Sequence, residues 1–201
     1  MLYVVGRLVR GIAVQNNVMY VVCYKSSIIS TYSADTLSPI SEDIDVEGMT
    51  DLVDMGACRH DRQLYVLTES KCIYRVLTKS PSQYEQWLTV QSTGRVKAIS
   101  VTSRRVLVTS WPRSLHQYNT TDRQLLRVVQ LPQFVRWLSH AVETARETFI
   151  VCHHGTAQSE RQSAVSKRRS LSSYDGMTIS YAYHQSVSST NTNTKTHNSD
   201  R

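Results

Sequence analysis

The residues Cys152-His153-His154 are of types that bind transition metals, and they lie side by side. Adjacent residues of a strand point to opposite faces, so at most two of the three can converge on one ion. His60, His116 and His140 are far from them and from one another in the sequence. We therefore interpret the cluster as polar residues at the end of a strand and predict no metal site.

Other catalytic patterns are also missing from the sequence. It has no Gly-rich phosphate loop, no Gly-x-Ser-x-Gly motif and no Ser, His and Asp grouping. The four cysteines have no CxxC spacing, which favours free thiols in a reducing compartment: Cys23, Cys58, Cys72 and Cys152. The sequence predicts that the chain is not an enzyme and needs no cofactor.

Charge and hydropathy bound the environment of the chain. The 201 residues carry a formal net charge of +7, which permits contact with nucleic acid or acidic surfaces without requiring it. No apolar run is long enough to span a bilayer, so we expect no membrane association. Charged residues and glycines interrupt the apolar N-terminus, Met1 to Val14, which is unlike a cleaved signal peptide. We expect a cytoplasmic protein.

A repeat of about 43 residues sets the organisation of the chain. Four similar apolar runs begin at residues 19, 64, 106 and 149. An apolar segment and a short polar turn precede each run, as in a β-hairpin; the four segments are Ile12–Val14, Met55–Cys58, Ile99–Val101 and His140–Val142. Each repeat therefore begins with two adjacent strands.

Further strands follow the apolar runs in the first three repeats. A third strand is expected at 28–32, 72–76 and 115–118, and a fourth at 44–46, 86–89 and 125–129. Four strands per repeat without intervening helices are typical of a β-propeller blade. We predict an all-β, propeller-like array of about three and a half blades, at residues 11–50, 51–94, 95–135 and 136–155 within a domain of residues 1–155. Closing such an array would need missing blades or a partner chain.

Two segments permit other interpretations. Trp137, Ala141 and Ala145 have helical spacing within residues 130–148, but Pro132 and the register of the repeat favour a strand. Residues 156–201 are polar and of low complexity, and we predict a disordered tail in which Tyr174 to Tyr183 is a candidate for an isolated strand.

The second repeat resembles an NHL repeat. The resemblance rests on Gly48–Cys58, the Leu64–Val66 strand and Cys72–Val76, with Leu52 in place of the usual proline and Leu67-Thr68 in place of Ala-Asp. The chain is therefore similar to six-bladed, TolB-like propellers, as a partial and divergent member. This resemblance implies a platform that binds protein or RNA on a propeller face.

Arginines recur in the turns between the first and second strands of successive repeats. Equivalent turns project from one side of a propeller, so these residues could form a basic rim for RNA or a partner: Arg59, Arg62, Arg104, Arg105 and Arg146. Exposed turns are often rich in arginine, so the structural interpretation stays open. Lys167-Arg168-Arg169 precedes Ser170, which matches a basophilic-kinase acceptor site.

The functional prediction is a non-enzymatic scaffold that binds a protein partner through its loops. An RNA-binding propeller that uses the arginine rim is the alternative. A metal-dependent hydrolase is a third hypothesis, because enzymatic six-bladed propellers hold a divalent cation with acidic and amide residues. Asp54, Glu69 and Asn16 are the candidates for such a role here, and Glu143 is expected to lie solvated in a turn.

Overall fold

Strands build the part of the chain that the structure describes. The computed structural model describes residues 3–4, 6–40, 43–46, 48–58, 60–78, 83–133, 135, 137–145, 148–154, 171–174 and 177–183. Every regular element among these residues is a strand, and none of the residues belongs to a helix that could cross a membrane. The prediction of an all-β fold is confirmed.

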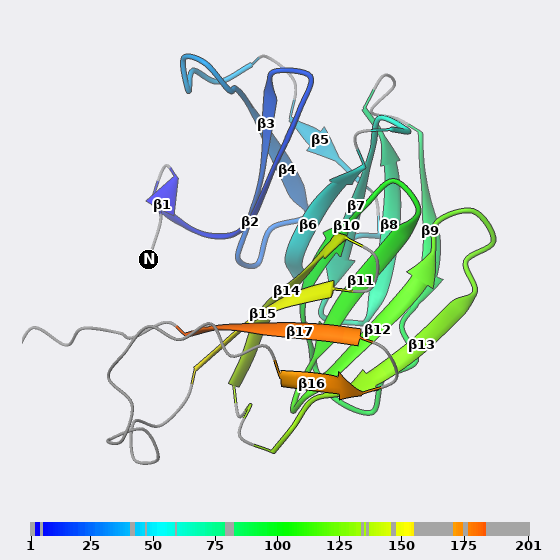
Figure 1. Cartoon of the computed structure of the whole chain (residues 1–201). Helices are drawn as coiled ribbons and strands as arrows, with labels where there is room; N and C mark the ends of the chain where they lie inside the picture. The colour runs from blue at the N-terminus through cyan, green and yellow to red at the C-terminus, as the bar shows by residue number, and fades with distance from the viewer. Residues whose placement is uncertain are drawn as a thin grey trace, which may run out of the picture.

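The first three sheets are antiparallel meanders, in which each strand pairs with the next along the chain (Figure 1). The first sheet contains β1 (Tyr3–Val4), β2 (Arg7–Gln15), β3 (Val18–Cys23), β4 (Ile28–Ser33) and β5 (Ile44–Asp45). The second contains β6 (Leu52–Cys58), β7 (Gln63–Thr68), β8 (Cys72–Leu77) and β9 (Tyr84–Thr89). The third contains β10 (Val96–Val101), β11 (Arg105–Ser110), β12 (Ser114–Asn119) and β13 (Leu125–Gln130).

The fourth sheet has a different topology. It contains β14 (Trp137–Ala145), β15 (Thr148–His154), β16 (Leu171–Tyr174) and β17 (Met177–Tyr183), in the order β14-β15-β17-β16. Strand β17 runs parallel to β15, in the place that an antiparallel third strand holds in the other sheets. The half blade expected at residues 136–155 is thus completed by strands from further along the chain.

The apolar runs form β3, β7, β11 and β15, the second strand of each repeat, as the sequence predicts; in the first sheet β1 pairs with β2 and precedes the repeat. Nearly every residue of β3, β7 and β11 beyond the first one or two is buried. The helical alternative for residues 130–148 is wrong, because β14 occupies Trp137–Ala145. Most of the tail, residues 156–201, lies outside the described residues; within it β16 and β17 are strands, and β17 covers most of the segment expected near Tyr174 to Tyr183.

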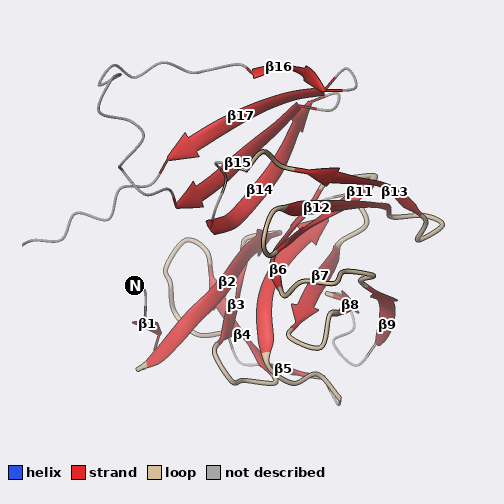
Figure 2. Ribbon diagram, turned by 90° about the horizontal axis from the view of Figure 1, so that it is seen from below, coloured by secondary structure: helices blue, strands red, loops and turns tan. Residues whose placement is uncertain are grey.

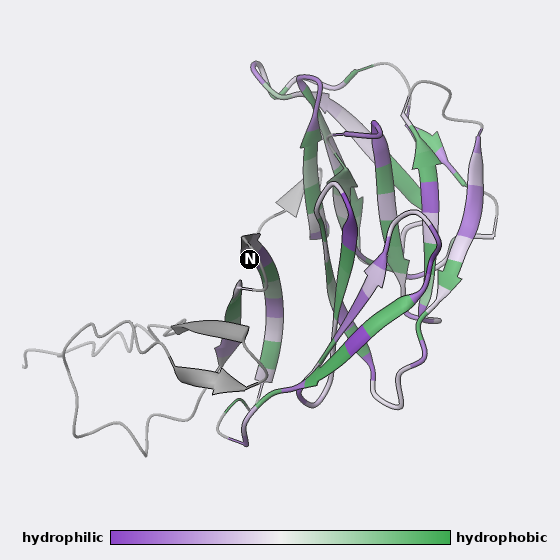
Figure 3. Cartoon of the chain, turned by 45° about the vertical axis from the view of Figure 1, so that its right-hand side comes forward, coloured by the Kyte–Doolittle hydropathy of each residue, from purple (hydrophilic) through white to green (hydrophobic). Residues whose placement is uncertain are grey.

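Three apolar clusters hold the four sheets together. One lies between the first and second sheets, a second between the second and third, and a third between the third and fourth. The apolar residues follow the strands through the interior, and the turns at the ends are more polar (Figure 3). In the second cluster the rings of Tyr65 and Trp87 meet edge to face, with centroids 5.1 Å apart.

The first strands of successive sheets pack side by side. Strand β6 contacts both β2 and β10, and β10 contacts β14. The joint between β2 and β6 requires Gly11, because a Cβ there would lie 2.8 Å from the amide nitrogen of Met55 and 3.0 Å from the Cα of Asp54. The sheets therefore follow one another around an incomplete ring, in which the first and fourth are the terminal sheets (Figure 2).

Candidate interaction face

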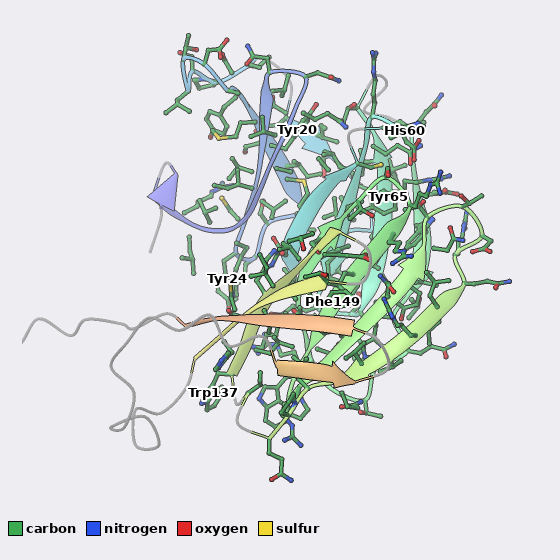
Figure 4. All side chains as sticks on the ribbon, viewed as in Figure 1. Tyr20, Tyr24, His60, Tyr65, Trp137 and Phe149 are labelled. Carbon is green, nitrogen blue, oxygen red and sulfur yellow. The ribbon has the colours of Figure 1, made fainter. Side chains whose placement is uncertain are left out.

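The antiparallel topology gives the array two ends. We count β2, β6, β10 and β14 as the first strands of their sheets. The turns between first and second strands, and those between third and fourth strands, then lie at one end, which we call the hairpin face. The remaining turns and the links between sheets lie at the other end, the opposite face. In Figure 4, His60 marks the hairpin face at the top and Trp137 marks the opposite face at the bottom.

One backbone hydrogen bond recurs on the hairpin face in the first three sheets. The amides of Ala34, Thr78 and Thr120, which follow the third strands, donate to carbonyls in the first turns. The acceptors are the carbonyl oxygens of Asn17, Arg62 and Arg104, at 2.9, 3.4 and 3.0 Å respectively. These three residues therefore occupy equivalent positions.

Arg62 and Arg104 are both exposed at this position. Arg62 has a φ of 53°, and its carbonyl also accepts a 2.8 Å bond from the hydroxyl of Thr78. The Oγ1 of Thr102 accepts from the amide of Arg104 at 3.4 Å. These hydrogen bonds fix the backbone at both positions. Neither guanidinium has an ionic or hydrogen-bonding partner among the residues that the structure describes, so both charges face solvent.

Arg105 differs from these two residues. It is the first residue of β11, and its Nη1 lies 2.5 Å from Oε1 of Glu143 on β14. Oε2 of Glu143 accepts a 2.8 Å hydrogen bond from the buried side chain of Gln117. The expectation that Glu143 is solvated in a turn is wrong, because β14 continues past it and Arg105 compensates its buried charge.

The structure does not place every residue of the expected rim. Arg59 and Arg146 lie outside the described residues, and so does Ser170. Of the five arginines, the structure brings Arg62 and Arg104 to the hairpin face with charges that no described residue compensates. Their role in binding stays a prediction.

A row of hydrogen bonds connects the first turns of neighbouring sheets. The buried Gln15 donates from Nε2 to the carbonyl of Cys58 at 2.6 Å. The Sγ of Cys58 lies 3.7 Å from the carbonyl of Thr102, in the third sheet. The hydroxyl oxygen of Thr78, which donates to Arg62, also lies 3.2 Å from Oε1 of Gln15. These contacts hold the turns of the hairpin face at fixed positions relative to one another.

Exposed aromatic side chains mark the opposite face. Among the side chains that the structure describes, the exposed aromatic ones are Tyr24, Trp111 and Trp137. Tyr24 and Trp111 lie in turns between second and third strands, and Trp137 begins β14. The guanidinium of Arg10 stacks 4.4 Å from the ring centroid of Tyr24. This grouping was not predicted from the sequence, although the turn positions of Tyr24 and Trp111 within the repeat could have indicated it.

The candidate cation ligands of the hydrolase hypothesis do not converge. Asn16 lies in the β2–β3 turn on the hairpin face, whereas Glu69 lies in the β7–β8 turn on the opposite face, where it pairs with Arg95. Asp54 is buried between them on β6. Among the described residues no three His, Cys, Asp or Glu side chains gather in a way that could hold a metal ion.

Asp54 nevertheless has an unusual environment. Its Oδ2 accepts a 2.9 Å hydrogen bond from the amide of Ile99 on β10 and lies 3.7 Å from Nδ1 of His140 on β14. Burial raises the pKa of Asp54 to about 7, against the lowering effect of backbone hydrogen bonds from Ile99 and Met55. Burial also lowers the pKa of His140. Asp54 therefore connects the first strands of the second, third and fourth sheets.

The cysteines and the Cys152-His153-His154 cluster have ordinary surroundings. All four cysteines are free thiols, with Cys23 and Cys58 buried. His153 is buried and Cys152 is half-buried on the same strand, β15. Their alternation along the strand sends the two side chains to opposite faces of the sheet, as expected.

Comparison with known proteins gives the fold. No family model matches the chain, and no curated protein is significantly similar to it. The WD40 propeller domain of Doa1 superposes with a TM-score of 0.58 and 15% identity, over 72% of this chain and 48% of that one. The WD40 repeats of RRP9 give 0.51 and 13%, over 63% and 40%, and the designed Ika4 protein gives 0.55 and 9%, over 73% and 86%.

These similarities are limited in extent. The chain spans less than half the length of either WD40 domain, and identities of this size bear on the fold alone. The NHL resemblance stays a prediction, since the similar structures include WD40 propellers and no family model matches. The four sheets and these neighbours together show a propeller-like array.

Proposed function

We propose that this chain is a non-enzymatic interaction module that binds an acidic surface of a protein partner through its hairpin face. The observation that carries the proposal is the pair Arg62 and Arg104, exposed at equivalent turn positions with charges that no residue described by the structure compensates. Because hydrogen bonds already hold the turns in place, little conformational entropy would be lost when a partner binds to them. The free thiols fit the reducing environment of the cytoplasm, where we place the protein.

RNA is the second candidate ligand, because the same arginines could contact phosphates. Binding of single-stranded RNA usually combines basic residues with aromatic stacking on one surface. Here the exposed aromatic residues Tyr24, Trp111 and Trp137 belong to the opposite face. The charge of Arg105, which the rim hypothesis counts as free, is compensated by Glu143. Both observations favour a protein partner.

The test is affinity capture with charge-reversal variants of the full chain. The bait proteins are the wild type, the Arg62→Glu/Arg104→Glu variant, and a control with the same charge change on the opposite face, Arg7→Glu/Lys97→Glu. Each capture is repeated after RNase treatment. We expect proteins that the wild type and the control retain, that the Arg62/Arg104 variant loses, and that RNase does not remove.

Two outcomes would count against this proposal. Equal capture by all three bait proteins would show that the hairpin arginines do not contribute to binding. Loss of the captured material on RNase treatment, with recovery of RNA by the wild type alone, would replace the protein partner with RNA. In that case the logarithm of the binding constant should fall linearly with the logarithm of the salt concentration.

A further inference from the structure

Neighbouring sheets pack face to face, and we call each such contact a joint. In the first two strands of a sheet, residues at alternate positions face the next sheet, and the residues between them face the preceding sheet. A joint therefore consists of the next-facing side of one sheet and the preceding-facing side of the sheet that follows it. Gly11 of β2 faces β6, and Gly56 of β6 faces Val101 on β10, which fixes the direction in successive sheets. The pairing registers then identify the equivalent residue in every sheet.

The face of the first sheet that looks away from the second carries two exposed apolar residues of β2, Ile12 and Val14, beside the buried Val21 of β3. Ile12, Met55, Ile99 and Ala141 hold equivalent positions, each opposite a corresponding residue of the second strand. The last three are at most 3% exposed because the preceding sheet covers them, whereas Ile12 is 42% exposed. Val14, two residues further along on the same face, is 50% exposed.

The fourth sheet shows the complementary half of the joint. Tyr20, Tyr65 and Leu107 face the following sheet and are at most 6% exposed. Ile150 holds the equivalent position on β15 and is 36% exposed. Cys152, two residues further along, is half-buried, whereas its equivalents Val22 and Leu67 are fully buried. Among the side chains that the structure describes, the fourth sheet therefore presents the apolar residues Ile150 and Cys152 on its next-facing side without a sheet that covers them.

We propose that a second copy of this chain covers these faces, with the fourth sheet of one copy packed against the first sheet of the other. Each face is the missing half of a joint that already occurs three times within the chain, and the contact would continue that joint from one copy to the next. Such a contact joins two different surfaces, so it is head to tail and gives a closed ring or a longer assembly. It uses the sides of the array and is independent of the hairpin face.

The test measures the mass of the full chain in solution by sedimentation over a range of concentrations. We expect a species of at least twice the chain mass of 22.9 kDa, in reversible exchange with the monomer. The Ile12→Asp/Val14→Asp variant and the Ile150→Asp variant should each weaken association at least tenfold. Leu126→Asp is the control, because Leu126 is 47% exposed on the outer strand β13, away from both faces, and it should associate like the wild type.

Mixing the two variants tests the head-to-tail arrangement itself. The Ile12/Val14 variant retains an intact fourth sheet, and the Ile150 variant retains an intact first sheet. Their mixture should therefore form a heterodimer although each alone is monomeric, a recovery that also shows that both variants are folded. A wild-type chain that stays monomeric at every concentration would overturn the proposal. Association that survives both sets of substitutions, or that mixing fails to restore, would overturn it as well.

Discussion

Glu143 on β14 accepts a hydrogen bond from the guanidinium of Arg105 on β11, with 2.5 Å between Oε1 and Nη1. The side chain of Glu143 is 8% exposed, and its second oxygen is held by Gln117 on β12. Nε of Arg127 on β13 in turn donates to Oε1 of Gln117 at 2.8 Å. A charged network thus joins the fourth sheet to three strands of the third, beside an apolar cluster.

Replacing the carboxylate should weaken this joint. In Glu143→Gln an NH2 group replaces one of the two carboxylate oxygens. This NH2 group would face either the NH2 group of Gln117 or the guanidinium of Arg105, so a donor would oppose a donor. Because the site is buried, we expect a loss of about 2 kcal/mol in the free energy of unfolding. Urea denaturation of the full chain measures this loss.

Glu85→Gln is the matched control for this prediction. Glu85 also pairs with arginines, Arg75 and Arg123, but its side chain is 40% exposed. We expect a change of less than about 1 kcal/mol, since exposed ion pairs contribute little. Equal effects of the two substitutions would show that Glu143 is not buried in the joint.

The stability of the chain should depend on pH through Asp54. Burial raises the pKa of this carboxyl from 3.8 to about 7, so the folded chain binds a proton that the unfolded chain has already released between these values. The contribution of Asp54 to the free energy of unfolding is therefore fully present below about pH 4. It is lost as the pH rises through about 7, by roughly 4 kcal/mol in total. Urea denaturation at a series of pH values measures the decline.

Asp54→Asn isolates this contribution, because an asparagine does not titrate and can still accept the bond from Ile99. His140 has the opposite sign: its lowered pKa means that stability is lost as pH falls. The titration of His140 largely cancels when the free energy of unfolding of the variant is subtracted from that of the wild type at each pH. A difference that stays constant from pH 4 to pH 8 would contradict the burial of the carboxyl.

Gln15→Ala should destabilise the hairpin face. The substitution leaves the carbonyl of Cys58 without its 2.6 Å donor and opens a gap between the first two sheets. We expect a loss of about 1 to 2 kcal/mol in the free energy of unfolding, measured by urea denaturation. Gln86→Ala, on the exposed outer strand β9, should change it by less than about 0.5 kcal/mol. A neutral Gln15→Ala would show that the row of hydrogen bonds does not hold the turns.

The repeat carries most of the fold within the sequence itself. Each apolar run pairs with a neighbour along the chain through a short turn, so local pattern is enough to locate β3, β7, β11 and β15 and the strands that precede them. Asn16 and Asn17 illustrate this, since both have positive φ in the two-residue turn of the first hairpin, and asparagine tolerates that conformation. The parallel pairing of β17 with β15 depends on segments far apart in sequence, which no local pattern specifies.

Long-range pairing also limits what could be predicted about the candidate face. The sequence shows arginines in turns but not their partners, so Arg105 and Arg104 look alike until β14 brings Glu143 beside one of them. Similarly, the polar residues around Glu143 suggest a turn, although a partner on another sheet allows its carboxylate to be buried. Exposure of Arg62 and Arg104 follows from the turn positions and could be predicted.

The binding role of the hairpin face is tested most directly by site-specific photo-crosslinking in cells. In one variant of the chain a photoreactive residue replaces Ser103, which is exposed beside Arg104. In a second variant it replaces Thr50, which is exposed on the opposite face. We predict that position 103 forms crosslinks to protein that position 50 does not, and that Arg62→Glu/Arg104→Glu abolishes them. Crosslinks of equal yield and identity from the two positions, or none from position 103, would contradict the account.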